Sequence, residues 1–137
     1  MTQDDTINAI LDNCRTVAVV GLSPKPHRDS FRVAQYMQQH GWRIVPVNPN
    51  AREVLGQKAY PSLSEAARFE RIDLVNCFRN SADIPPIVDE AIAIGAKALW
   101  MQLGVAHTAA ADTARAAGLL VVENRCLKID HAAHART

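Results

Sequence analysis

Residues 16–47, TVAVVGLSPKPHRDSFRVAQYMQQHGWRIVPV, contain two short apolar runs separated by a polar loop and an amphipathic segment. The apolar runs at residues 16–22 and 43–47 lack regular polar alternation, which is typical of strands buried on both faces. Between them, residues 30–40 carry apolar side chains at helical spacing, and Gly41 fits a carboxyl-terminal helix cap. This strand–helix–strand unit predicts two parallel strands joined by a right-handed crossover.

The same alternation continues along the chain. Further apolar runs occupy residues 72–78, 98–103 and 119–122, and segments with helical spacing occupy residues 63–69, 84–94 and 108–117, with Gly95 and Gly118 at carboxyl caps. Five buried strands with intervening helices predict one Rossmann-like α/β domain over residues 1–137, a doubly wound five-stranded parallel sheet with helices on both faces. We expect the strand order 3-2-1-4-5, a leading helix within residues 1–14 and a flexible tail at residues 131–137.

Composition and charge narrow the class of protein. With 48% hydrophobic and 21% charged residues, the 137-residue chain has enough apolar surface for one globular core. A net charge of +1 argues against nucleic acid or a membrane surface as partner. The amino terminus has no signal peptide or long apolar run, so we expect a cytoplasmic protein. Three widely spaced cysteines, Cys14, Cys77 and Cys126, fit neither a disulfide framework nor a zinc ribbon.

The loop that follows the first strand, residues 21–30, has the features of a phosphate-binding loop. Ligands of doubly wound sheets bind beyond the carboxyl ends of the strands. Gly21 would let the backbone approach a ligand closely, Lys25 and Arg28 add positive charge, and the helix amino terminus offers free N–H groups. The competing interpretation is a solvated loop in which the glycine serves only the turn.

The Rossmann dinucleotide fingerprint is incomplete in this loop. Of its three glycines only Gly21 is present, and Ser23 and Arg28 stand where others are expected. The second strand also lacks a terminal acidic residue that would bind a ribose hydroxyl. These departures disfavour NAD, whereas NADP stays open because Arg52 could meet a 2′-phosphate.

Four segments together carry a family resemblance: VAVVGLSPKPHRDS at residues 17–30, VPVNP at 45–49, GQKAYP at 56–61 and CLKIDH at 126–131. They resemble the small single-domain CoA-binding proteins, a family similar to the CoA-binding domain of succinyl-CoA synthetase α subunits and of ADP-forming acyl-CoA synthetases. The resemblance covers nearly the whole chain and implies coenzyme A or an acyl-CoA as ligand. It implies no reaction, because the phosphohistidine and nucleotide sites of the synthetases lie in other domains.

The resemblance also implies roles for particular residues. It places Gly21, Ser23, Lys25, Arg28 and Ser30 around the pyrophosphate and 3′-phosphate of CoA, Asn48 and Pro49 beside the adenosine, and Gln102 and Gly104 near the pantetheine arm. An Asx turn before the proline is an equal alternative for Asn48.

The ends of the third and fifth strands add candidates on the same edge of the sheet. Phe78 could stack on adenine or simply pack in the core, and Arg79 adds a cation at the mouth of the crevice. Asn124, Arg125 and Cys126 follow the fifth strand. Cys126 allows two interpretations, exchange with the pantetheine thiol beside Arg125 or Lys128, or the commoner fate of a buried structural thiol.

No catalytic constellation is evident. The five histidines are scattered without metal-ligand spacing, and no nucleophile elbow or acid–base pair is recognisable. The sequence therefore predicts a CoA-binding module without a metal. The alternatives are an NADP-dependent oxidoreductase and an acyl-CoA-responsive regulatory subunit, and a homodimer or a partner enzyme is possible.

Overall fold

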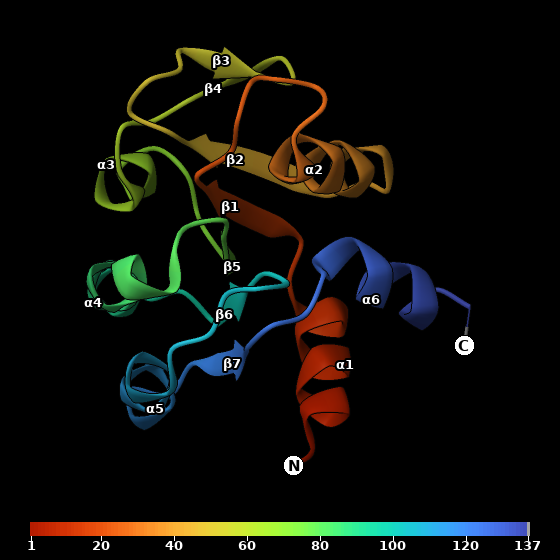
Figure 1. Ribbon diagram of the computed structural model, residues 1–137, viewed down its shortest axis with the longest axis vertical. Helices are drawn as coiled ribbons and strands as arrows, with labels where there is room; N and C mark the ends of the chain where they lie inside the picture. The colour runs from red at the N-terminus through yellow and green to blue at the C-terminus, as the bar shows by residue number, and fades with distance from the viewer. Residues whose placement is uncertain (137) are drawn as a thin grey trace.

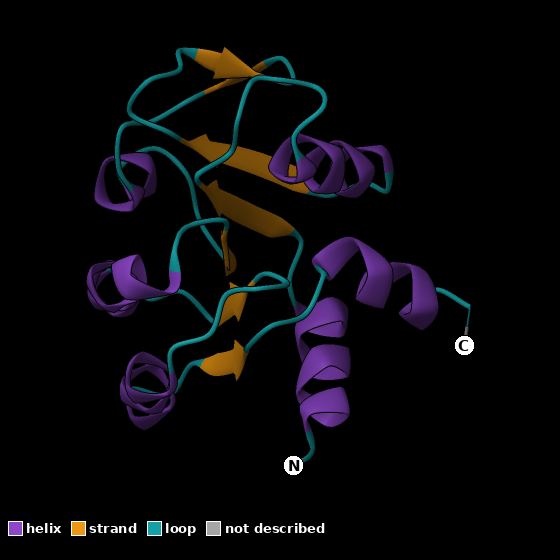
Figure 2. Cartoon of the chain, viewed as in Figure 1, coloured by secondary structure: helices purple, strands orange, loops and turns teal. Residues whose placement is uncertain are grey.

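A five-stranded parallel sheet lies between two layers of helices in the computed structural model, which describes residues 1–136 (Figures 1 and 2). Its strands are β1 (Thr16–Val20), β2 (Arg43–Val47), β5 (Leu74–Cys77), β6 (Ala98–Met101) and β7 (Leu120–Val122). Figure 1 shows α3 (Leu63–Ala67), α4 (Ile84–Ala93) and α5 (Thr108–Ala116) on one side of the sheet, and α1 (Gln3–Asn13), α2 (Asp29–Gln39) and α6 (Leu127–His134) on the other. The predicted doubly wound α/β fold is confirmed.

The core is split between the two faces of the sheet, as the continuous apolar runs predict. In β1, Ala18 and Val20 pack in the cluster with α3, α4 and α5, whereas Val17 and Val19 pack in the cluster with α1, α2 and α6. All four side chains are buried. Burial on both faces explains why this strand has no polar alternation.

The strand order differs from the prediction. Counted along the chain, the five strands lie in the order 2-1-3-4-5 rather than 3-2-1-4-5, because β5 pairs with β1 instead of extending the sheet beyond β2. The segment after the short hairpin β3 (Glu53–Val54) and β4 (Gln57–Lys58) occupies the outer edge of β2. There the Tyr60 N–H donates to the Pro46 carbonyl at 3.0 Å, and the Asn48 N–H donates to the Tyr60 carbonyl at 2.9 Å.

This order places the reversal of winding between β1 and β5. The chain leaves β1 through α2 on one face of the sheet and leaves β5 through the 3₁₀ turn η1 (Ser81–Asp83) and α4 on the other. Loops that diverge in this way open a crevice at the carboxyl ends of the strands, where open α/β sheets bind ligands. The topology therefore predicts a ligand site in the crevice between β1 and β5.

The predicted flexible tail is wrong as far as His134. Residues 131–134 form the second half of α6. The helix is held from two sides, because His131 Nδ1 lies 2.9 Å from the Tyr36 hydroxyl and His134 Nε2 lies 2.8 Å from the Asp12 carboxylate. Thr137, the last residue of the predicted tail, lies outside the described residues. None of the helices within residues 1–136 is long and apolar enough to cross a membrane.

An ion pair ties the edge strand β2 to the segment after α3. The Arg43 guanidinium donates to both carboxylate oxygens of Glu70, at 2.7 and 2.8 Å, and the Tyr60 hydroxyl donates to Oε2 at 3.2 Å. The hydrogen bonds from Arg43, more than any other group, hold the pKa of Glu70 below its ordinary value. Stability from a lowered carboxyl pKa is complete above the unfolded-state pKa of about 4.3 and is lost as the pH falls through the folded-state pKa.

Glu70→Gln is therefore expected to lower the free energy of unfolding at pH 7 by about 1 kcal/mol, a modest value because half of the Arg43 side chain is exposed. Denaturant titrations at several pH values should show the difference shrinking below about pH 4. Glu65→Gln is the matched control, since Glu65 meets Arg68 at 3.3 Å on the open surface and should change stability very little. Equal losses in the two variants, or a loss independent of pH, would contradict this interpretation.

Candidate ligand-binding crevice

Gly21 lies where the loop after β1 contacts the loop after β5. Its φ is 87°, in the left-handed region, and its N–H donates to the Val47 carbonyl at 2.9 Å. A Cβ at this position would overlap the carbonyl oxygen of Phe78 and lie 3.0 Å from Cδ of Arg79. Only glycine therefore lets the two loops meet at the point where the winding reverses.

Residues 21–30, here called the cradle loop, are shaped by their own side chains. The Ser23 N–H donates to Ser30 Oγ at 3.0 Å, and the Lys25 N–H donates to Ser23 Oγ at 3.1 Å. The Arg28 N–H closes a turn on the Lys25 carbonyl at 3.1 Å. Ser23 and Ser30 thus fix the loop conformation, and a direct contact of either with a ligand stays a prediction.

A depression over the cradle loop gathers positive charge. It is lined by Gly21, Ser23, Lys25, Arg28, Asp29, Ser30 and Phe78. Lys25 and Arg28 are exposed, and neither forms an ion pair with another residue in the described part of the chain. Helix α2 begins here without a side-chain cap, so its first N–H groups are available to an anion. With Lys25 and Arg28 positive and only Asp29 negative, the net charge of the residues that line this depression is positive.

A second depression adjoins the first, because Asp29 and Phe78 line both. Its other residues are Val33, Arg79, Asn80, Gln102, Leu103, Val105 and Cys126. Gln102 is only 6% exposed, and its Oε1 accepts from the Leu127 N–H at 3.4 Å. Phe78, Arg79, Gln102 and Cys126 therefore come together as predicted for the ends of the third, fourth and fifth strands.

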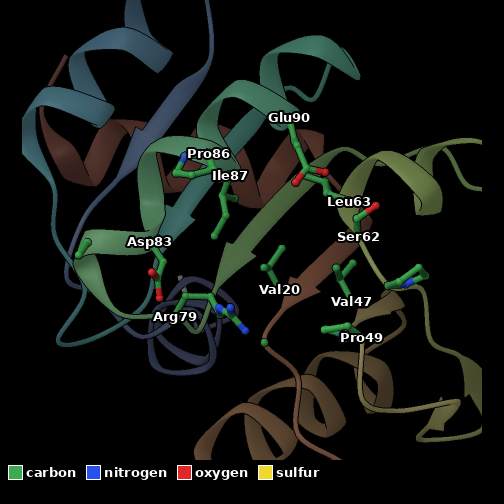
Figure 3. A pocket seen from close by; sticks show the side chains of 13 residues that line it. Val20, Val47, Pro49, Ser62, Leu63, Arg79, Asp83, Pro86, Ile87 and Glu90 are labelled. Atoms are coloured by element: carbon green, nitrogen blue, oxygen red, sulfur yellow. The ribbon is translucent and has the colours of Figure 1, made fainter.

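A third depression lies on the α3 and α4 side of the crevice and shares Gly21 and Arg79 with the other two (Figure 3). Val20, Val47, Pro49, Leu63, Pro86 and Ile87 give it an apolar lining, and Ser62, Asp83 and Glu90 add polar groups. Pro49 is the only predicted site residue from the second strand among them. Sequence reasoning missed the residues of α3 and α4, because no motif marks them and only the folded chain brings them to this edge.

Asn48 has a structural role. Its Oδ1 accepts from the Asn50 N–H at 2.8 Å, which is the Asx turn considered as an alternative. Its Nδ2 donates to the Leu22 carbonyl at 2.9 Å. Asn48 thereby clamps the loop after β2 to the cradle loop, and it lines none of the three depressions described above.

Three further predicted residues lie apart from the crevice lining. The Gly104 N–H donates to Asn124 Oδ1 at 2.7 Å, so these two residues join the loops after β6 and β7. Arg125 extends toward α6 and α1, where its Nη2 contacts Asp130 Oδ1 at 2.6 Å and it lines a separate depression with Asp4. The chain turns at Asn124, whose φ of 57° is left-handed, so adjacency to Cys126 in sequence does not bring Arg125 into the crevice.

The three cysteines differ in accessibility. Cys14 and Cys77 are buried, and burial raises the pKa of their thiols to about 11 and about 12, respectively. Cys126 is partly exposed and opens α6 at its N-cap. It is the cysteine that lines the crevice.

Comparison with known proteins finds a family model and several relatives that match this chain. A family model described as "CoA binding domain" matches residues 15–132. The uncharacterized protein YneT of Bacillus subtilis is 39% identical over 126 residues, which are 92% of each chain. A solved structure of a hypothetical protein from Pyrococcus horikoshii OT3 superposes with a TM-score of 0.91 at 38% identity, covering 98% of this chain and 93% of that one.

A further match extends to a larger enzyme. The ADP-forming acetate–CoA ligase II of Archaeoglobus fulgidus is 29% identical over 85 residues, which are 61% of this chain but 12% of the ligase. The family match is far longer, because it runs from the start of β1 into α6 and includes the cradle loop and all three depressions. The chain therefore belongs to the family of CoA-binding domains.

Proposed function

We propose that the protein binds coenzyme A or an acyl-CoA in the crevice between β1 and β5. The observation that carries the proposal is the cradle loop. It combines two cations that form no ion pair with any residue from 1 to 136 and a helix amino terminus that lacks a side-chain cap. A pyrophosphate and a 3′-phosphate supply the negative charges that such a loop accommodates. Family membership supports CoA among the phosphorylated ligands that fit this chemistry.

The three adjoining depressions suggest an orientation for the ligand. In the proposed arrangement the phosphates lie at Lys25 and Arg28, where the positive charge is. The adenosine lies in the apolar depression beside Pro49, and the pantetheine arm runs past Phe78 toward Gln102. Pantetheine contains two amide carbonyls, and the Gln102 side-chain nitrogen is a donor that bonds no described residue.

NADP is the competing ligand. Arg52, the residue that could meet its 2′-phosphate, lines none of the three depressions. The cradle loop also keeps only the first glycine of the dinucleotide fingerprint. Both observations favour CoA. An acyl-CoA-responsive subunit of a larger assembly would use the same binding site. Its ligand binding is therefore tested by the same unfolding experiment.

Thermal unfolding in the presence of CoA, acetyl-CoA, NADP and NAD tests the proposal, because a ligand that binds only the folded state raises its stability. CoA and acetyl-CoA are expected to raise the unfolding temperature, with a stabilisation of about 2.7 kcal/mol at a ligand concentration of 100 times Kd. NAD and NADP at the same concentrations should leave it unchanged. A rise with NADP alone, or no rise with any of the four, would overturn the proposal.

A further inference from the structure

We propose that Cys126 is a modification site, which captures coenzyme A as a mixed disulfide by thiol–disulfide exchange. The inference rests on the proposed function, because the CoA moiety must first occupy the crevice. It also goes further, since it assigns a covalent step to one side chain and a redox state to the ligand. The oxidised co-reactant is CoA disulfide.

Access separates Cys126 from the other two thiols. Cys14 and Cys77 lie in the core with at most 1% of their surface exposed. Cys126 is partly exposed, lines the second depression with Phe78 and Arg79, and makes no capping hydrogen bond at the start of α6. A disulfide held in the crevice can therefore reach this thiol and neither of the others.

Gln102 independently indicates that a ligand arm lies beside Cys126. Gln102 is 6% exposed and lines the same depression, and its amide nitrogen donates to no described residue. Gln102 Nε2 is not one of the fully buried atoms without a partner, so it keeps some contact with solvent and can donate to an acceptor on a bound ligand. The other end of the same amide accepts from the N–H of Leu127, the residue after Cys126. Gln102 thus contacts the backbone next to Cys126 and offers a donor to a carbonyl of the pantetheine arm.

The cradle loop fixes which end of the ligand meets the thiol. Lys25 and Arg28 line the depression that adjoins the one containing Cys126, and Phe78 lines both. Phosphates held by the two cations therefore direct the remainder of CoA across Phe78. The sulfur is the terminal atom of that arm and lies on the Cys126 side.

The exchange is balanced without a further oxidant. The Cys126 thiol gives its proton to solvent, and its sulfur attacks the nearer sulfur of CoA disulfide. A new S–S bond forms between Cys126 and one CoA moiety as the original S–S bond breaks. The second CoA leaves as a thiolate and takes a proton from solvent. CoA disulfide is thereby half reduced and Cys126 is oxidised, and an added thiol reverses the reaction.

Intact-mass measurement of the reduced protein after incubation with CoA disulfide is the test, with glutathione disulfide as the matched reagent that lacks a nucleotide. The expected result is a mass gain of one CoA moiety, mapped by proteolysis to Cys126 and removed by dithiothreitol. The reaction should be roughly tenfold or more faster than with glutathione disulfide, because binding places the sulfurs together. Arg28→Ala should slow the reaction with CoA disulfide and leave that with glutathione disulfide unchanged. Cys126→Ser should gain no mass.

The possible failures are distinguishable. If reduced CoA still raises the unfolding temperature but the parent protein forms no adduct, the inference about Cys126 is overturned and CoA binding stands. If reduced CoA has no effect on unfolding, the proposed function itself fails. Equal rates with the two disulfides would show an ordinary exposed thiol and would also overturn the inference. Peptide mapping of the parent identifies the modified cysteine even if the Cys126→Ser variant does not fold.

Discussion

Gly21→Ala is expected to lower the free energy of unfolding by about 2–5 kcal/mol and to abolish stabilisation by CoA. A left-handed φ of 87° costs a side chain about 1–2 kcal/mol. The new Cβ would also overlap the Phe78 carbonyl oxygen and force the loops after β1 and β5 apart, an overpacking cost of about 1–3 kcal/mol. Denaturant unfolding with and without CoA measures both effects.

Gly41→Ala is the matched control. Gly41 has the same φ of 87°, but a Cβ there would meet nothing within 4 Å. This variant should lose only the conformational part, about 1–2 kcal/mol, and should keep its stabilisation by CoA. If the two variants lost equal stability and both still responded to CoA, the close approach of Gly21 to Phe78 would have no role in the site.

Arg28→Ala is expected to raise the Kd for CoA by about tenfold to a hundredfold. A hydrogen bond between charged partners contributes about 1.5–3 kcal/mol, and each 1.4 kcal/mol is about a factor of ten in affinity. Since Arg28 forms no ion pair with the described residues, the stability of the unliganded protein should change little. Isothermal titration calorimetry gives the affinity directly, and Lys25→Ala should behave similarly.

Arg32→Ala controls for the loss of one positive charge. Arg32 is exposed on α2, one helical turn beyond Arg28, and lines none of the three depressions. Its removal should weaken CoA binding less than about threefold, because an exposed charge that makes no direct contact with the ligand interacts with it only through high-dielectric, salt-containing solvent. Equal weakening by the Arg28 and Arg32 variants would indicate a general electrostatic effect and no defined phosphate site.

Hydrophobic periodicity was sufficient to predict the strands and most helices, because each main strand is buried on both faces. The strand order was not predictable in this way. Both doubly wound orders bury the same side chains, and the choice depends on the chain near Tyr60, which occupies the outer edge of β2. Helix α6 was missed because only Leu127 and Asp130 are buried in it, which leaves no apolar period to detect.

The candidate site was predictable where a rule of topology applies. The carboxyl ends of parallel strands share one edge, so the cradle loop, Phe78, Gln102 and Cys126 were expected together. The direction of a side chain after a turn follows no such rule, and Arg125 pairs with Asp130 outside the crevice. The contribution of α3 and α4, exemplified by Glu90, depends on packing that no local motif signals.

An amide NMR titration with CoA reports both whether the ligand binds and where. The proposal predicts saturable changes concentrated in residues 21–30, at Phe78 and Arg79, and at Gln102 and Cys126. A separate depression lined by Asp73, Lys97 and other residues lies away from the cradle loop and serves as the internal reference. CoA binding in the crevice between β1 and β5 would be contradicted by the absence of any saturable change. Changes confined to the reference depression around Asp73 and Lys97 would contradict it as well.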